Sequence, residues 1–223
     1  MPAIDYATLL PKIWAALGET LIMVGGSFFF ASIIGLLLGL ALYATRSGNL
    51  LENRSVFVVL NAIVNVLRPI PFIILAVALI PLTRIVMGQG YGPVAAVFPL
   101  TIAAGVAIAR IVESNLVAVD PGVIEAGSAM GARPARVLFG IVVPEALGPL
   151  TLGLTYIFVA LIEATAVAGV IGGGGLGNLA MTYGYQRFDW FVMIVVIVVI
   201  ILLVQVAQLI GNLIARRVMH EDA

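Results

Sequence analysis

The sequence predicts an all-α integral membrane protein with five transmembrane helices. Of the 223 residues, 62% are hydrophobic and only 10% are charged, and the mean hydropathy is +1.20. A soluble domain of ordinary composition is far more polar. The apolar residues also form continuous runs, whereas the strands of a membrane β-barrel alternate between apolar and polar positions. We therefore expect helices that cross a lipid bilayer.

Five apolar runs reach the roughly 20 residues that a membrane-spanning helix needs. They lie at about 20–45, 56–82, 93–117, 149–170 and 190–214, within a single transmembrane domain over 1–223. Apolar residues at helical spacing between Leu9 and Leu17 predict a separate short helix at the membrane surface. Pro69 and Pro71 are expected to break the second span. Small residues four apart in the first span predict close helix packing, namely Ala31, Gly35 and Gly39.

Basic residues outside the bilayer predict the orientation. Arg110 counts among them, because the third run is expected to leave the bilayer near this residue and to continue as a helix into the cytoplasm. Seven lie on one side, namely Arg46, Arg54, Arg110, Arg133, Arg136, Arg216 and Arg217. Three lie on the other side, namely Lys12, Arg84 and Arg187. Because positively charged loops stay in the cytoplasm, this bias predicts a multi-pass membrane protein whose first set of basic residues faces the cytoplasm. Its N-terminus would lie outside and its C-terminus in the cytoplasm.

Several functions are excluded by what the sequence lacks. Without cysteine it cannot form disulfides or thiolate metal sites, and its formal net charge of zero does not favour nucleic acid. Gly172, Gly174 and Gly177 satisfy G-x-G-x-x-G, but they follow a membrane helix instead of a strand and are interpreted as a flexible loop. No P-loop pattern is present. We therefore expect no catalytic residue, no metal site and no bound cofactor in this chain.

The stretch "VDPGVIEAGSAMGARPARVLFGIVVPEALG", from Val119 to Gly148, is the longest one that is not strongly apolar. Asp120 followed by Pro121 predicts a helix start, and Gly131 can end that helix in the left-handed conformation. The predicted helix therefore covers about 121–131, and Pro134 begins another. These features fit a docking element for a second protein and a surface helix packed on its own bundle equally well.

The spacing in this stretch resembles the EAA loop of ATP-binding-cassette (ABC) importer permeases. Glu125, Ala126, Gly131, Ile141 and Pro144 match that pattern, and Gly127 and Val143 replace an alanine and a leucine. The resemblance implies the ABC type I importer permease fold, with a cytoplasmic coupling helix that fits a groove on an ATPase. The ATPase-coupling residues would be Ile124, Glu125, Ala126, Gly127, Met130, Gly131 and Arg133.

Two further stretches are similar to the methionine importer permease (MetI) family. They are "NVLRPIPFIILAVALIPLTRIVMG" around the second span and "GGGGLGNLAMTYGYQRFD" after the fourth, and the likeness extends from about Glu19 to Arg217. It implies a homodimer with the substrate path between two copies, two cytoplasmic ABC ATPase subunits that bind the ATP, and an external methionine-binding lipoprotein. The implied function is the permease subunit of an ATP-driven methionine importer that works by alternating access, and the implied location is the bacterial inner (cytoplasmic) membrane.

Two ionisable residues lie deep within predicted spans. Arg68 and Glu163 are both roughly 20 Å from the cytoplasmic surface at about 1.5 Å per residue. An unpaired charge at that depth costs at least about 2.5 to 3.5 kcal/mol. Either the two side chains form a structural ion pair, or Arg68 meets the carboxylate and Glu163 the ammonium group of a passing amino acid. Both are therefore candidate residues of the substrate pathway or gate.

Three alternatives remain open at this point. Glu163 to Val167 reads "EATAV" where the MetI pattern is close to "GYSAM", so a different small amino acid or related solute could be the substrate. An autonomous secondary carrier would fit the broken helix at Arg68, but five spans cannot form two equal halves and no repeat is visible. A purely structural membrane subunit is the third alternative, and the intramembrane charges argue against it.

Overall fold

The computed structural model describes residues 6–49 and 51–220, and within them it contains helices and no strand. Four helices are long and apolar enough to cross a membrane, or five if the broken pair 54–67 and 72–78 counts as one span. The prediction of an all-α fold with five spans is confirmed on this reading.

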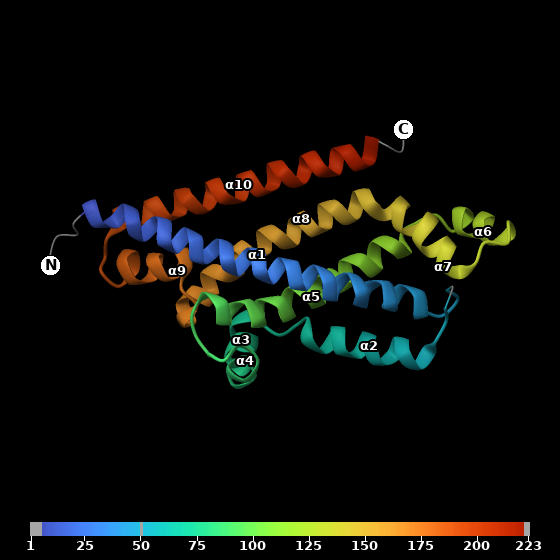
Figure 1. Cartoon of the computed structure of the whole chain (residues 1–223), viewed down its shortest axis with the longest axis horizontal. Coiled ribbons are helices and arrows are strands. Elements are labelled where there is room, and N and C mark those ends of the chain that lie inside the picture. Colours follow the sequence, from blue (N-terminus) through green and yellow to red (C-terminus); the bar gives the residue numbers. More distant parts are fainter. Residues whose placement is uncertain (1–5, 50, 221–223) are drawn as a thin grey trace. The chain divides into compact units, whose positions relative to one another are not determined.

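Four long helices carry most of the chain (Figure 1). They are α1 (Tyr6–Thr45), α5 (Pro93–Val117), α8 (Val143–Ala168) and α10 (Trp190–His220). Shorter α-helices lie between them: α2 (Arg54–Leu67), α3 (Phe72–Ala78), α4 (Ile80–Met87), α6 (Pro121–Ala129), α7 (Pro134–Val137) and α9 (Gly175–Leu179). Wider π-helical turns form η1 (Leu138–Val142), η2 (Gly169–Gly173) and η3 (Ala180–Tyr185).

The helix bounds test the predicted spans directly. The third span coincides with α5, and the second is broken where expected, since α2 ends at Leu67 and α3 begins at Phe72. The predicted separate helix between Leu9 and Leu17 is wrong, because these residues belong to the continuous helix α1. Only Gly18 and Glu19 separate them from the first apolar run; one glycine costs a helix about 1 kcal/mol, and glutamate is a good helix former.

The described residues form two compact units. Unit 1 contains 6–30, 70–103 and 158–207, and unit 2 contains 31–49, 51–69, 104–157 and 208–220. The helices α1, α5, α8 and α10 each contribute residues to both units. The single domain over 1–223 stays a prediction, and its ends 1–5 and 221–223 lie outside the described residues.

Unit 1 is held together by apolar contacts among α1, α9 and α10. Its buried cluster comprises Leu9, Ala16, Leu176, Leu179, Val192 and Val196. Beside it, Lys12 Nζ and Arg187 Cζ lie 4.7 Å and 4.5 Å from the ring centre of Tyr183, within cation–π distance. A hydrogen bond to Lys12 lowers the pKa of the Tyr183 hydroxyl. These contacts join the N-terminal part of α1 to the turn before α10.

Unit 2 is built on the close approach of α1 and α5. A Cβ atom added to Gly35 would lie 2.5 Å from Cβ of Ile108, and one added to Gly39 would lie 2.5 Å from Cβ of Val112. Only glycine therefore fits at either position, and the predicted role of these small residues in helix packing is confirmed. Next to this contact, α2 joins a buried cluster of Leu42, Val64, Val106 and Ala109.

Candidate coupling segment and intramembrane polar cluster

The helix α6 begins with a local side-chain cap. The carboxylate of Asp120 accepts a 2.8 Å hydrogen bond from the backbone N–H of Gly122, and Pro121 occupies the first helical position. Proline is favourable there because that N–H would have no partner within the helix. Asp120 also places a negative charge at the positive end of the helix dipole. The predicted start of the helix is confirmed.

The C-terminus of α6 is closed by a Schellman motif. Gly131 has a φ of 77°, and its N–H donates to the carbonyl of Ser128 at 3.0 Å, while the N–H of Ala132 donates to Gly127 at 3.3 Å. These bonds satisfy carbonyl groups that otherwise lack partners at a helix end. The left-handed conformation predicted for Gly131 is confirmed, and α6 is closed at both ends.

One buried residue attaches α6 to the chain that leads into α8. Gly127 is the buried position of α6, and a Cβ atom there would lie 2.6 Å from Cδ1 of Ile141 and 3.7 Å from Cγ2 of Val137. Ile141 belongs to η1, which continues directly into α8. A displacement of α6 would therefore act on the start of α8 through this contact.

The rest of the segment is open to its surroundings. The side chains of Glu125, Ala126 and Arg133 are exposed, and that of Ile124 is half-buried. Met130 is the C-cap of the helix, and its side chain is 80% exposed.

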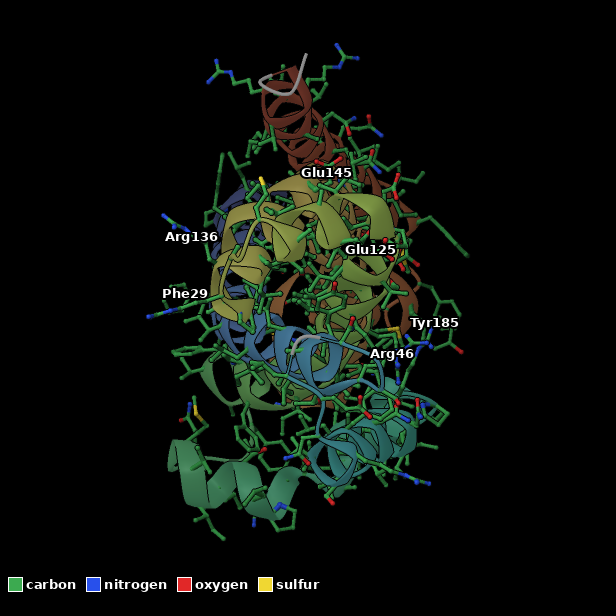
Figure 2. The ribbon with its side chains drawn as sticks, turned by 90° about the vertical axis from the view of Figure 1, so that its right-hand side faces the viewer. Phe29, Arg46, Glu125, Arg136, Glu145 and Tyr185 are labelled. Carbon is green, nitrogen blue, oxygen red and sulfur yellow. The ribbon has the colours of Figure 1, made fainter. Side chains whose placement is uncertain are left out.

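A basic hollow lies next to α6. It has a volume of about 470 Å³ and is lined by Gly131, Ala132, Arg133, Ala135 and Arg136. In Figure 2 the side chain of Arg136 projects from the ribbon on one side of this segment, and Glu125 lies toward the other. The segment thus offers a partner an acidic residue, two arginines and the apolar Met130.

Neither deep charge has a described partner. The side chains of Arg68 and Glu163 are both exposed, and neither forms a hydrogen bond or an ion pair with the residues that the structure describes. Arg68 caps the C-terminus of α2, where its N–H donates to Val64, and belongs to unit 2, whereas Glu163 lies in α8 within unit 1. Their pairing, and their place in a substrate pathway, stay predictions.

A polar cluster in unit 2 joins α5 to α2. The Nη1 atom of Arg110 lies 2.5 Å from Oε2 of the buried Glu113. Its Nη2 donates to Oδ1 of Asn61 at 2.9 Å and to Oδ1 of Asn65 at 2.6 Å. Within 6–49 and 51–220, the Nε atom of Arg110 is buried without a hydrogen-bond partner. One guanidinium group therefore fixes three side chains on two helices.

The sequence interpretation missed this cluster, although a signal was present. Asn61, Asn65 and Arg68 are spaced by four and three residues in an otherwise apolar helix, so they share one face. Arg110 and Glu113 are likewise three apart on α5. Arg110 had been interpreted only as a cytoplasmic charge. Polar residues at helical spacing inside a predicted span would have indicated the cluster.

The glycine run after α8 is anchored to α1 and α5. Oε2 of Glu19 accepts a 2.6 Å hydrogen bond from the N–H of Gly175, and Oγ1 of Thr20 accepts one of 2.9 Å from the N–H of Leu176. The N–H of Gly92 donates to the carbonyl of Gly172 at 2.8 Å. The interpretation of the run as one loop was incomplete, because its last part forms α9.

A small cavity lies beside this run within unit 1. Its volume is about 30 Å³, which is room for about two water molecules. Most lining residues are small or apolar, and Tyr91, Gly92 and Gly172 are among them. The cavity thus lies between the glycine run and the helices α3 and α4, from which Phe72, Ala76, Ile80 and Thr83 line it.

These features define a class of protein. Apolar helices that carry polar residues at depth are typical of proteins that move solutes, and α6 is an exposed, doubly capped helix between two candidate spans. The chain belongs to the family of binding-protein-dependent transport system inner membrane components, which matches residues 31–220.

Two curated relatives and one solved structure make the comparison more specific. The chain is 40% identical to the "Probable D-methionine transport system permease protein MetI" of Vibrio cholerae, over 98% of this chain and 95% of the relative. It is 44% identical to the "Methionine import system permease protein MetP" of Bacillus subtilis, over 92% of each chain. A structure described as inward-facing MetNI methionine ABC transporter matches with a TM-score of 0.91 and 40% identity, over 95% of this chain and 98% of the other.

Proposed function

We propose that this chain is the membrane-spanning permease subunit of an ATP-driven methionine importer. The observation on which this proposal rests is the structure of α6. This helix is capped at both ends, exposed along Glu125 and Ala126, and packed through Gly127 on Ile141 of η1, which leads into α8. Relatives described as methionine permeases, matched over nearly the whole chain, support methionine as the substrate. The family's dependence on a binding protein disfavours an autonomous carrier.

The proposed assembly has two copies of this chain, two cytoplasmic ABC ATPase subunits and an external methionine-binding lipoprotein. The N-terminus is outside and the C-terminus is in the cytoplasm, so α6 faces the ATPases. ATP is bound by those subunits, and the permease itself needs no cofactor. Closure of the ATPase pair moves α6, and the contact of Gly127 with Ile141 passes this movement to α8. The path between the two permeases thereby opens alternately to either side.

A second substrate class is supported by one residue. Glu163 places an exposed carboxylate on α8, where the MetI pattern has a small residue. If this side chain lines the path, a solute with an additional cationic or hydrogen-bond donor group would be favoured by charge complementarity. The alternative is therefore an ABC permease for another small amino acid.

The test is uptake into proteoliposomes that contain this chain with its own ATPase and binding protein. Radiolabelled L- and D-methionine serve as substrates, and other unlabelled amino acids serve as competitors. We expect uptake that requires ATP and is blocked mainly by methionine. Uptake of another amino acid with no effect of methionine would overturn the substrate, and uptake that persists without ATP or without the ATPase would overturn the permease assignment.

A further inference from the structure

The side-chain amides of Asn61 and Asn65 lie on the face of α2 that contacts Arg110, and hydrogen-bond chemistry determines their orientation. The amide oxygen and nitrogen of an asparagine are hard to tell apart by shape, but a guanidinium group can only donate hydrogen bonds. Since Nη2 of Arg110 contacts both Asn61 and Asn65, the oxygen of each amide must point toward Arg110. The NH₂ group of each amide therefore points away from it.

These two NH₂ groups remain available. Neither Asn61 nor Asn65 donates a described hydrogen bond through Nδ2, the side chain of Asn65 is exposed, and that of Asn61 is half-buried. Arg68 follows Asn65 by three residues on the same face and adds a guanidinium group with no described ion pair. The donor face, defined as Asn61, Asn65 and Arg68, thus presents two NH₂ groups and one guanidinium group as hydrogen-bond donors.

The charge of the surroundings fits an anion. Arg110 and Glu113 form a neutral pair at 2.5 Å, so the remaining charge beside the two amides is the positive charge of Arg68. Asn61 and Arg68 lie seven and fourteen residues after Arg54, at which α2 begins, or about 10 Å and 21 Å along the helix axis. Counted from the predicted cytoplasmic end of α2, both residues lie inside the apolar core of a bilayer, which is about 30 Å thick.

We propose that the donor face binds the carboxylate of the amino acid during its passage, with Arg110 as the positioning residue that holds both amides in the donating orientation. This inference rests on the proposed function as an amino-acid importer. The carboxylate would accept from Nδ2 of Asn61 or Asn65 and from the guanidinium group of Arg68. The ammonium group and the side chain of the substrate are not bound by this face.

The substitution Asn65→Asp distinguishes carboxylate binding from a purely structural role, because the two roles predict opposite effects. Asn65→Asp keeps an oxygen for Arg110 and adds a charge-assisted bond to it, so a structural role predicts unchanged or better assembly. The substitution also removes the donor and places a negative charge against the substrate carboxylate. We expect methionine uptake to fall about tenfold or more, while the ATP hydrolysis that loaded binding protein stimulates stays within about twofold.

Asn53→Asp is the matched control on the same helix. The side chain of Asn53 accepts from the N–H of Val56 at the N-cap of α2, and an aspartate oxygen serves equally there. Uptake by this variant should equal that of the unmodified protein. Asn61→Asp should reproduce the loss seen with Asn65→Asp.

The positioning role of Arg110 is tested by a separate measurement, the number of methionine molecules moved per ATP hydrolysed. Replacing Arg110 by methionine and Glu113 by glutamine leaves no buried charge unpaired and no donor from residue 110 beside the amide oxygens. The amides are then free to turn, so methionine moved per ATP hydrolysed should fall. Arg110→Lys keeps a donor beside the amide oxygens and should restore at least half of that ratio. Equal losses of uptake and hydrolysis in both variants would indicate a structural role instead.

The outcomes are distinguishable from a failure of the proposed function. If the unmodified complex imports methionine with ATP and Asn65→Asp imports it equally well, the donor face is overturned and the permease assignment stands. If the unmodified complex imports no amino acid, the proposed function fails, and the carboxylate site fails with it. Loss of uptake in the control Asn53→Asp to the same extent would also overturn the site, because the effect would then not depend on the donor face.

Discussion

Two short helices in this protein begin with an acidic cap, and they obtain it in different ways. The helix α6 is capped by Asp120, two residues before the amide that it binds. The helix α9 is capped by Glu19 and Thr20, which are 156 residues away on α1. Both arrangements satisfy free N–H groups at a positive helix end. The first needs only its own stretch of chain, and the second exists only after α1 and α9 have packed.

The buried glycines of the two helices differ in their surroundings, because Gly127 faces a flexible side chain and Gly177 faces backbone atoms. A Cβ atom on Gly127 in α6 would meet the terminal methyl group of Ile141 at 2.6 Å, which can move aside. A Cβ atom on Gly177 in α9 would meet the carbonyl oxygen of Ala166 at 2.3 Å and its Cα at 2.5 Å. These are backbone atoms of α8, which cannot move aside as a side chain can. The helix α6 thus packs through a side-chain contact, whereas α9 packs directly against the backbone of α8.

The largest effect on uptake is expected from a substitution on the exposed face of α6, a face that the buried α9 lacks. Glu125→Lys reverses the charge offered to the ATPase and should reduce ATP-dependent methionine uptake to background, while the protein remains in the membrane. Glu145→Lys is the matched control, because Glu145 is also exposed but lies in the first turn of α8. Uptake and co-purification of the ATPase are measured for both variants. Full uptake by Glu125→Lys would remove the coupling role of α6.

The second prediction compares the two buried glycines. Gly177→Ala should lower the free energy of unfolding by about 3 kcal/mol, because the new methyl group overlaps backbone atoms. Gly127→Ala should change it by less than about 1 kcal/mol, since better helix propensity offsets the displacement of Ile141. The apparent unfolding temperatures of the purified complexes decide between these outcomes. Equal shifts would show that the difference between side-chain and backbone contacts is not decisive.

The third prediction tests the distant cap. Glu19→Ala removes a hydrogen bond between a carboxylate and the N–H of Gly175, worth about 1.5 kcal/mol or more. Hydrogen exchange at that amide should accelerate about tenfold, whereas Glu19→Gln keeps an acceptor and should have a smaller effect. Unchanged exchange at Gly175 in Glu19→Ala would mean that Thr20 and the packing of α9 suffice.

The smallest effect is expected at the local cap. Asp120→Ala should cost about 1 kcal/mol in the local stability of α6 and accelerate exchange at the amide of Gly122 about fivefold. Asp120→Asn, which can cap as well, serves as the control. Because the cap is local, exchange at Gly175 should remain unchanged. A change there would contradict the independence of the two helices.

The sequence alone determined the elements whose causes are local. Continuous apolar runs predicted α5 to the residue, Pro69 and Pro71 predicted the break after α2, and Asp120, Pro121 and Gly131 predicted both ends of α6. In each case the chemistry lies within a few residues of its effect, as in a cap, a ring that blocks a hydrogen bond, or a glycine with positive φ. The same locality made the resemblance of residues 125–144 to a coupling loop visible.

Only the tertiary structure decided the contacts between distant segments. Nothing near Gly175 indicates that Glu19 caps it. The spacing of Asn61 and Asn65 indicates a polar face, but it does not identify Arg110 as the group that binds their amide oxygens. Sequence reasoning offered Glu163 as one partner for Arg68, because depth along a span can be counted from residue numbers, and that pairing stays a prediction. The partner that a side chain meets depends on which helix faces pack together, and that choice is made by the whole set of apolar contacts at once.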